Sequence, residues 1–536
     1  MGRDDGGRER RAPLPHSAFR IPYSSRTSLH VGVRCSLVWL LHNQALSKKT
    51  ADRSQLIAFI VAVAFFMENL DGTAIATALP QMALSFGVSP AHLSIGITAY
   101  LVTLAIFIPI SGWIADRFGT RTVFATAIVV FTIASVFCGL STGLIQFILA
   151  RILQGIGGAM MVPVGRLVVL RSTPKDQLIR AIATITWPGL IATVIGPPVG
   201  GFITTYFSWH WIFLINVPIG LAGILLVGKF VPNFRSGKHQ PLDLPGFLLG
   251  AACLSCLMYG VELLGREDAD WLMAAIFLLL SLLFGWFTIR QERRTEWPIF
   301  NFSLLNIPTY AIPLLAGSLT VVAIGAAPFL LPLMFQAGFG MSAFESGLLV
   351  LVYAAGNLLM KTATTRMLQR FGFRAVLLAN TPLIALFAIA CGSLGANTPV
   401  PLIAVVLLGA GLVRSLQFTS LNTLAFSDVP VHGMSSASMM YSTIQQLAFG
   451  IGIAFAAVAL RLATMIRGQA HGYQSSDFRI AFVLVAAVAL LSLPPYWRLN
   501  RNAGVAVSGR PITGSEQEKP GLSTETRPTG GHKEGT

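Results

Sequence analysis

The sequence predicts an all-α membrane protein whose chain crosses the bilayer many times. Of its 536 residues, 54% are hydrophobic and only 11% are charged, and the mean hydropathy is +0.68. A soluble globular protein carries about 25% charged residues. The apolar residues lie in many long runs, which is typical of a polytopic helical membrane protein and excludes a soluble domain with a single anchor.

Fourteen apolar runs are each long enough to cross about 30 Å of hydrocarbon at about 1.5 Å per helical residue. The expected spans are 56–80, 91–113, 121–141, 143–170, 180–203, 211–231, 244–264, 271–290, 307–335, 344–365, 374–394, 399–426, 433–460 and 478–498. Glycine and proline interrupt several of them, which a packed membrane bundle tolerates. We therefore expect fourteen transmembrane helices.

The positive charges in the loops predict the orientation of the chain. With the N-terminus in the cytoplasm, the loops on that side carry fifteen Lys and Arg residues and the opposite loops carry four. This bias follows the positive-inside rule and also favours an even number of spans. We therefore expect both termini in the cytoplasm. Topology then explains the net charge of +16, and nucleic acid is not an expected partner.

The two ends of the chain are predicted to be tails. Residues 1–54 are basic and lack a signal-peptide pattern, and no methionine follows Met1 until Met67. A disordered tail and a mis-assigned start codon are both compatible with this segment. Residues 499–536 are expected to form a disordered tail.

A short motif occurs twice in the chain. "GWIADRFGTR" (Gly112 to Arg121) follows the second span, and "TRMLQRFGFR" (Thr365 to Arg374) follows the tenth span. A repeat at matching places in two halves predicts two homologous six-helix bundles. The expected units are a first bundle, a pair of linker helices and a second bundle, at 56–231, 244–290 and 307–498.

Several motifs resemble the major facilitator superfamily, and within it the fourteen-span drug/proton antiporter branch of the multidrug efflux type. The loop motif of this family is matched at Gly112, Asp116, Arg117, Gly119 and Arg121. The span-4 motif is matched in "RILQGIGGAMMVPVGR" at Arg151, Gln154, Gly155, Gly157 and Gly158. The span-5 antiporter motif is matched in "GLIATVIGPPVGG" at Gly189, Gly196, Pro197, Gly200 and Gly201. "WHWIFLINVPIG" and "NLDGTAIATALP" resemble the fourteen-span branch in particular, and the resemblance covers about residues 56–498.

The resemblance implies a major facilitator fold with two inserted helices. It also implies that the first loop motif holds one access state closed, whereas the plain alternative is a positive-inside loop. Asp116 is expected to pair with Arg117 or Arg121, or to face a helix N-terminus. The second copy has Gln369 in place of Asp116, so any such contact there differs. The span-5 motif is associated with exporters in the family, and a generic small-residue packing face is the alternative.

Two carboxylates, Glu68 and Asp71, lie deep in the first span, which is otherwise almost wholly apolar. Positions i and i+3 share a helix face, so both carboxyls can point into one cavity. Desolvation and a neighbouring negative charge each make a carboxyl easier to protonate. We expect the pair to face a water-accessible pathway and to couple proton movement to substrate. A structural ion pair with Arg151 or a hydrogen bond with a shared proton is the alternative, and only Asp71 belongs to the resembling motif.

Two arginines lie within predicted spans. Arg151 lies in the fourth span, where a permanent cation costs about 2.5–3.5 kcal/mol at the helix centre unless it finds a partner. The resemblance implies a part in proton coupling, and snorkelling to one surface is the alternative. Arg414 in the twelfth span departs from the small, polar pattern expected there. Three roles stay open for it: a carboxylate partner across the cavity, contact with an anionic substrate, or snorkelling.

These features predict a proton-coupled antiporter, not an enzyme, that exports lipophilic small molecules, cations among them, across the bacterial inner membrane. We expect no cofactor and no metal, with the proton gradient as the energy source. The expected partners are the substrate, protons and the lipid bilayer, and a periplasmic adaptor and an outer-membrane channel are further candidates. One alternative is a symporter that imports a polar metabolite, which the span-5 motif disfavours. Another is a non-transporting membrane sensor, for which neither tail offers an output domain.

Overall fold

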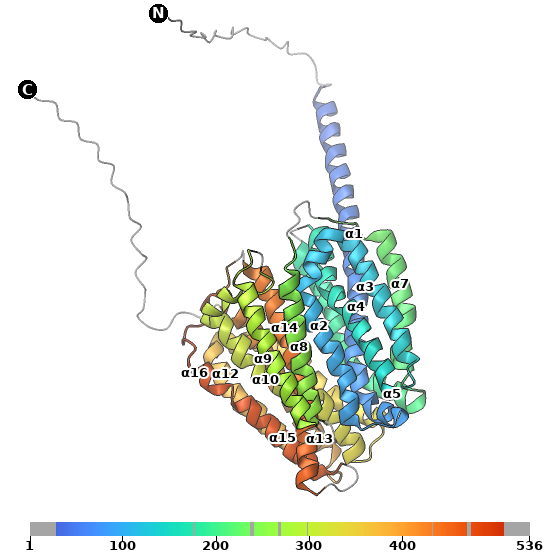
Figure 1. Ribbon diagram of the computed structural model, residues 1–536. Coiled ribbons are helices and arrows are strands. Elements are labelled where there is room, and N and C mark those ends of the chain that lie inside the picture. Colours follow the sequence, from blue (N-terminus) through green and yellow to red (C-terminus); the bar gives the residue numbers. More distant parts are fainter. Residues whose placement is uncertain are drawn as a thin grey trace, which may run out of the picture. The chain divides into compact units, whose positions relative to one another are not determined.

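The computed structural model describes residues 28–174, 177–235, 241–265, 270–296, 298–430, 433–468 and 473–508 (Figure 1). Within these ranges the regular structure is helical and no strand occurs. Fourteen helical spans among the described residues are long and apolar enough to cross a membrane. Each of them overlaps one of the fourteen runs expected from the sequence, so the predicted fold class is confirmed.

The first six spans are formed by seven helices, since α6 and α7 together make the sixth span. The helices are α1 (Ser28–Phe86), α2 (Pro90–Phe118), α3 (Thr120–Gly139), α4 (Leu144–Ser172), α5 (Leu178–Tyr206), α6 (Trp211–Leu214) and α7 (Asn216–Phe230). We call the part from Ser54 to Phe230 the N-terminal bundle. The start of α2 shows how the sequence sets such boundaries. Ser89 caps the helix through the backbone N–H of His92, and Pro90 occupies the first helical turn.

Two helices follow that lie between the halves in sequence, α8 (Leu244–Gly265) and α9 (Trp271–Glu292). The remaining elements, which we call the C-terminal bundle, begin after a short helix η2 (Phe302–Asn306). They are α10 (Pro308–Leu333), η3 (Met334–Gly338), α11 (Ala343–Phe371), α12 (Phe373–Gly392), α13 (Val400–Ala425), α14 (Met434–Ile466), α15 (Ser475–Leu490), α16 (Leu493–Trp497) and α17 (Val505–Ser508).

The two bundles repeat one local design with a constant offset of 253 residues. Gly87 and Gly340 turn the chain just before α2 and α11, with φ of 66° and 71°. Gly119 and Gly372 end the same two helices, with φ of 96° and 78°. Other residues are strained at a positive φ, so glycine is the residue that these turns require. The repeat seen in the loop motif therefore extends over whole helices.

The helices have two ends, which we name the Gly87 end and the Gly119 end after these turns. At the Gly87 end, one hydrophobic core joins the second half of α1 with α10, η3, α11 and other elements of the C-terminal bundle. Toward the Gly119 end, one core consists of residues 57–231 and two others consist of residues 304–503. The two bundles therefore share their large core at the Gly87 end, whereas the cores of the Gly119 end each belong to one bundle.

Contacts between the bundles follow two pairs of helices. α5 packs along α11, and α2 packs along α14. Two hydrogen bonds tie the Gly87 end: Gln336 Nε2 donates to the carbonyl of Thr77 at 3.0 Å, and the Phe344 N–H donates to Thr205 Oγ1 at 3.0 Å. These bonds lie beside the shared core and hold the same end of the molecule together.

The helices α8 and α9 lie against the junction of the two bundles. α8 contacts α9, α14 and α2, and Figure 1 shows it in green in front of that junction. Large apolar side chains are exposed on this pair, including Leu248, Leu279 and Leu282. In a chain that crosses the bilayer, such faces contact lipid.

Parts of both predicted tails are structured. Residues 28–53 belong to α1, which is compatible with a segment that has no proline and a single glycine, Gly32. They form a unit separate from residues 54–536. The expected disorder from residue 499 is wrong for residues 499–508, because Leu499 and Ala503 pack into a core of the C-terminal bundle. Residues 1–27 and 509–536 lie outside the described part of the chain.

Candidate functional site

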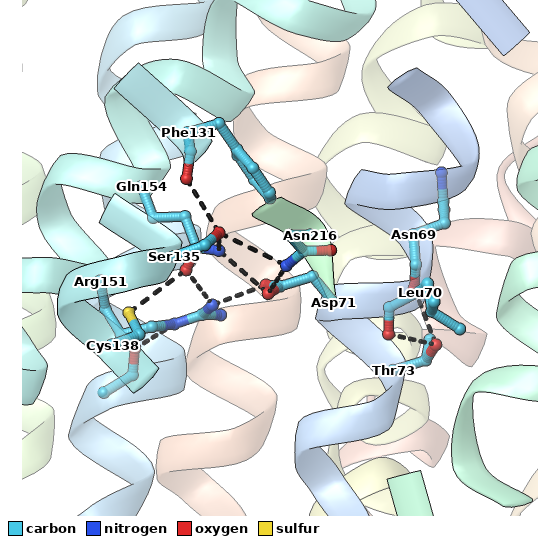
Figure 2. Close-up of polar contacts among 11 residues, drawn as sticks. Asn69, Leu70, Asp71, Thr73, Phe131, Ser135, Cys138, Arg151, Gln154 and Asn216 are labelled. Atoms are coloured by element: carbon cyan, nitrogen blue, oxygen red, sulfur yellow. Dashed lines mark hydrogen bonds and ion pairs between the residues drawn. The ribbon is translucent and has the colours of Figure 1, made fainter. Parts of the chain in front are cut away.

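A polar cluster in the interior of the N-terminal bundle is built around Asp71 of α1 (Figure 2). The side chains of Asp71 and Arg151 of α4 are both 0% exposed, and Oδ2 of the aspartate lies 2.7 Å from Nη1 of the arginine. The other carboxylate oxygen accepts hydrogen bonds from Gln154 Nε2 and Asn216 Nδ2, both at 2.9 Å. A buried carboxylate needs such a set of donors, and α4 and α7 supply it to Asp71 here.

Further contacts hold the donors of this cluster in place. Gln154 Nε2 also contacts Ser135 Oγ of α3 at 2.9 Å, and Arg151 Nη1 donates to Gln154 Oε1 at 2.5 Å. The Arg151 guanidinium lies 4.2 Å from the ring centre of Tyr100 on α2, which is a cation–π geometry. Its Nε donates to the carbonyl of Gly96 at 3.4 Å. Five helices of the N-terminal bundle therefore meet at one ion pair.

Glu68 lies one turn before Asp71 and has a different environment. Its side chain is partly exposed, and its Oε2 is buried with no hydrogen-bond partner among the described residues. A Cβ added at Gly158 would lie 3.0 Å from Tyr100 Oη and 3.6 Å from Glu68 Oε1, so both groups lie against that glycine. The carboxyls of Glu68 and Asp71 are close enough for their charges to interact. Glu68 is therefore the carboxyl of the pair that has no committed partner, on a residue that keeps some exposed surface.

The expectation that both carboxyls face a water-accessible pathway is wrong for Asp71 in this conformation. Its side chain has no exposed surface, because Arg151, Gln154 and Asn216 enclose it. The ion pair with Arg151, which was the alternative interpretation of the sequence, is the arrangement observed. Arg151 does not snorkel, since its side chain is 0% exposed. A part in proton coupling stays a prediction for both carboxyls.

The glycines of the span-4 motif allow neighbouring helices to approach α4. A Cβ at Gly155 would lie 2.7 Å from Cβ of Thr103 and 3.0 Å from the carbonyl oxygen of Tyr100, both on α2. A Cβ at Gly157 would lie 2.7 Å from the backbone nitrogen of Phe131 on α3. Larger residues would push these helices apart, and the contacts of Gln154 and Arg151 would be lost with them.

The span-5 motif packs α5 against two helices. A side chain at Gly196 would clash with Thr73, and one at Gly200 would clash with the carbonyl oxygen of Ala74, both on α1. Gly201 lies in the same way against the carbonyl oxygen of Ala343 on α11. The close approach expected from these small residues is observed, and it includes a contact between the bundles.

The remaining residues of the motif, Gly189 and Pro197, contact α1 and α11. A Cβ at Gly189 would lie 3.2 Å from Asn69 Nδ2. The carbonyl of Pro197 accepts a hydrogen bond from Thr77 Oγ1 at 3.3 Å, and a Cβ at Gly347 of α11 would lie 2.5 Å from the same oxygen. A role of this motif in export stays a prediction.

The loop motif after α2 is braced within its own bundle. Asp116 Oδ1 lies 2.8 Å from Nη2 of Arg171 at the end of α4, and the side chains of these residues are 42% and 31% exposed. The expected pairing of Asp116 with the arginines of its own loop is therefore wrong, because the end of α4 presents a nearer cation. Exposed pairs of this kind contribute about 0–1 kcal/mol.

The other residues of the loop contact the segment after α7 or the solvent. The Arg121 N–H donates to Asn233 Oδ1 at 3.1 Å, and any side chain at Gly119 would clash with that asparagine. The guanidinium of Arg117 lies 5.5 Å from the ring centre of the tryptophan one turn before it. Gly112 has open space where its Cβ would be. That the loop closes one access state stays a prediction.

Arg414 of α13 lies in the other half of the molecule. Its guanidinium is 5.4 Å from the ring centre of Tyr353 on α11, and its side chain is partly exposed. Among the described residues it forms no ion pair with a carboxylate. The first of the three roles left open for it, a carboxylate partner across the cavity, is therefore not observed.

Three residues of the Asp71 cluster were missed by sequence reasoning: Tyr100, Ser135 and Asn216. Asn216 gave a usable signal, because it is an amide within the apolar run "WHWIFLINVPIG". Serine and tyrosine are ordinary residues in membrane helices, so their positions in the sequence gave none.

Sequence comparisons identify the relatives of this chain. A sequence model of the Major Facilitator Superfamily matches residues 61–453. The "Putative multidrug resistance protein MdtD" of Salmonella heidelberg (strain SL476) is 38% identical over 455 residues, which are 83% of this chain and 94% of that protein. The protein of the same name from Salmonella typhimurium is 37% identical over 454 residues, with the same coverage of both chains.

Solved structures show the same fold at low identity. A D-xylose–proton symporter aligns with a TM-score of 0.59 and 13% identity, covering 85% of this chain and 99% of that one. An auto-inhibited peptide transporter of the POT family aligns with a TM-score of 0.62 and 15% identity, covering 83% and 97%. With fourteen membrane-capable spans in the described part of the chain and these matches, the chain belongs to the Major Facilitator Superfamily.

Proposed function

We propose that this protein is a proton-coupled antiporter that exports lipophilic small molecules across the bacterial inner membrane by alternating access. Its relatives carry the name multidrug resistance protein. The observation that carries the mechanism is the pair of carboxyls in α1: Asp71 is enclosed with Arg151, and Glu68 is partly exposed and unpaired one turn away. The proposal assigns transport and no catalysis, and the proton gradient is its energy source without a bound cofactor.

The packing of the two bundles is compatible with one state of an alternating-access cycle, in which the periplasmic side is closed. By the positive-inside rule the Gly119 end, which carries Arg117, Arg121 and Arg171, faces the cytoplasm, and so do both termini. The shared core then closes the periplasmic side, whereas the separate cores lie toward the cytoplasm. Rocking of the bundles would break the contacts of α5 with α11 at the Gly87 end and open the opposite face.

Protonation of Glu68 is the step that links protons to this motion. An ionised Glu68 repels the carboxylate of Asp71, which is held by Arg151. A protonated Glu68 removes that repulsion and leaves the ion pair between α1 and α4 intact. Each arrangement favours a different packing of α1 in its bundle. One elementary charge moved across 100 mV supplies about 2.3 kcal/mol, which is enough to drive useful accumulation.

The direct test is transport by the purified full chain in proteoliposomes with an imposed pH gradient. A panel of cationic, neutral and anionic lipophilic compounds would be offered, and accumulation would be followed with and without a protonophore. We expect at least one class to move against its gradient, in the direction opposite to protons, and to stop when the gradient collapses. Substrate accumulation that is the same with and without the pH gradient, or substrate that moves in the same direction as protons, would contradict the proposal. A periplasmic adaptor and an outer-membrane channel stay predictions that this assay does not require.

A further inference from the structure

The C-terminal bundle contains a cavity beside Arg414 that the mechanism above does not use. Its volume is about 40 Å³, enough for about three water molecules. Arg414 and Tyr353 line it from α13 and α11, and the rest of the lining is apolar apart from Cys391, with Ile324, Phe387 and Phe482 among its residues. A guanidinium in a small apolar cavity is a single polar group that can orient a small charged group.

The internal repeat shows what this cavity lacks. The offset of 253 residues relates Tyr100 to Tyr353 and Asp71 to Ile324. Each tyrosine lies beside an arginine of its own half, with 4.2 Å and 5.4 Å from the guanidinium carbon to the ring centre. In the N-terminal bundle, α1 presents a carboxylate to the arginine. At the equivalent place in the C-terminal bundle, α10 presents Ile324, which lines the same cavity as Arg414.

Arg414 has no charged counterpart in the N-terminal bundle. Gly155 of α4 and Gly411 of α13 are equivalent, because each lies against the carbonyl oxygen of the tyrosine in its own half. The offset of 256 residues between them relates Gly158 to Arg414. In the N-terminal bundle, the missing side chain of Gly158 leaves room for Tyr100 Oη and Leu104, and Glu68 Oε1 lies beside it. In the C-terminal bundle, the same position carries a guanidinium.

No acidic side chain of the C-terminal half offsets this charge. Residues 301–508 contain three acids, Glu345, Asp428 and Asp477. All three are engaged at helix ends, where the first caps α11, the second accepts a hydrogen bond from a threonine, and the third pairs with an arginine. Lys361 of α11 lies close enough to Arg414 for their charges to interact. The field in this part of the bundle is therefore positive, and a negatively charged ligand would be attracted to it.

We propose that this cavity binds the anionic group of the transported molecule, a carboxylate or sulfonate on an apolar body, with Arg414 as its ion partner. The inference rests on the proposed export function and names the substrate class of that function. A planar guanidinium binds a carboxylate through two parallel hydrogen bonds, and about 40 Å³ is room for that anionic group, so the apolar body of the ligand would extend beyond the cavity. The bound anion would lie in the cavity that Ile324, the counterpart of Asp71, also lines, and it would supply the negative charge that the described residues of this bundle do not.

Binding to the purified full chain tests this without any transport. The probes are 2-naphthoate and 2-naphthamide, which share one ring system and differ in charge, and their Kd values are measured by isothermal titration calorimetry. We expect naphthoate to bind at least about tenfold more tightly than the amide. Arg414→Gln should weaken naphthoate binding about tenfold and leave the amide unchanged, and Arg414→Lys should restore part of the loss. Arg366→Gln on the exposed end of α11 is the matched control and should change neither Kd.

A second variant restores the carboxylate that the repeat lacks. Ile324→Asp should pair with Arg414, abolish naphthoate binding and unfold at a higher temperature than Ile324→Asn, which has the same shape without the charge. Wild-type protein that binds no naphthoate, or variants of Arg414 that bind it as the wild type does, would overturn the proposal. If naphthoate binds through Arg414 but the protein shows no pH-driven transport, the anion site is supported and the antiport mechanism is refuted.

Discussion

The two halves of the molecule hold an arginine inside a helical bundle in different ways. Arg151 is fully buried and neutralised by Asp71, with two amides completing the cluster. Arg414 is partly exposed, lies beside Tyr353 and faces an apolar wall. A cation at membrane depth needs a partner or water. The first bundle supplies the partner from its own chain, whereas the second leaves the place open.

The comparison separates residues that maintain the fold from residues that specialise each half. The turn glycines and the tyrosine recur at one offset in both halves, because the helix boundaries and the close packing depend on them. The loop arginines recur at the same offset, Arg117 with Arg370 and Arg121 with Arg374, whereas the charged residues inside the spans do not. The two bundles therefore share their packing residues but differ in the charged residues inside them, and mutations can test whether these charged residues have different roles.

The largest effect is expected from breaking the ion pair of the N-terminal bundle. Asp71→Asn leaves the charge of Arg151 buried without its partner, which should lower the free energy of unfolding by about 3–5 kcal/mol. Proton-coupled efflux should be lost as well. The double variant Asp71→Asn/Arg151→Gln removes both charges and should recover much of the stability without recovering transport. Denaturant unfolding in detergent measures the first quantity, and a double variant no more stable than Asp71→Asn would show that the pair is not the cause.

A smaller structural effect and a specific functional effect are expected at Glu68. Glu68→Gln keeps the size of the side chain and removes its titration, so the protein should fold and reach the membrane. We expect accumulation driven by a pH gradient to fall to background, while exchange of labelled for unlabelled substrate continues. Both quantities are measured in the same proteoliposomes, and gradient-driven accumulation at the wild-type rate would exclude Glu68 as the proton-binding group.

The next effect concerns the contact between the bundles at the Gly87 end. Gly347→Val places a branched side chain against the carbonyl oxygen of Pro197, where a Cβ alone would lie at 2.5 Å. The α5–α11 contact should loosen, and the population open at the Gly87 end should increase. Spin-label distances between the ends of α5 and α11 would report this shift. Gly228→Ala is the control, because nothing lies within 4 Å of its added Cβ, and equal distances in both variants would contradict the expectation.

The smallest effect is expected at the exposed pair of the loop motif. Asp116→Asn should change the free energy of unfolding by less than about 1 kcal/mol, since both side chains of its pair with Arg171 are partly exposed. A change in transport rate that exceeds this small loss of stability would support the predicted role of the loop in closing one access state. Thermal unfolding and initial transport rates on the same preparation make that comparison, and unchanged transport would leave the loop a plain topological signal.

The fold was largely predictable from the sequence, because each span is a local property of composition and length. All fourteen spans are found, although α1 continues to Phe86 beyond the predicted end at residue 80. The additional turns include Gln81 and Ser85, whose polarity ends the apolar run before the helix ends. Hydropathy reports where lipid contact ends, whereas backbone hydrogen bonds decide where the helix ends.

The site was predictable only in part. Glu68, Asp71 and Arg151 stood out because charge is rare in apolar spans. The partner of Asp71 is 80 positions away on another helix, so choosing between a free carboxyl and an ion pair needed the packing of α1 against α4. The cavity beside Arg414 combines side chains from several helices, and no local pattern in the sequence reports such a place.

Proton movement driven by substrate tests the central claim most directly. Proteoliposomes containing the full chain and a trapped pH-sensitive dye would receive a substrate gradient without an imposed pH gradient. The mechanism predicts that the lumenal pH of wild-type vesicles changes as substrate moves, with protons flowing the opposite way, and that Glu68→Gln vesicles show no such change. Substrate flux without any pH change in the wild type, or an undiminished pH change in Glu68→Gln, would contradict it.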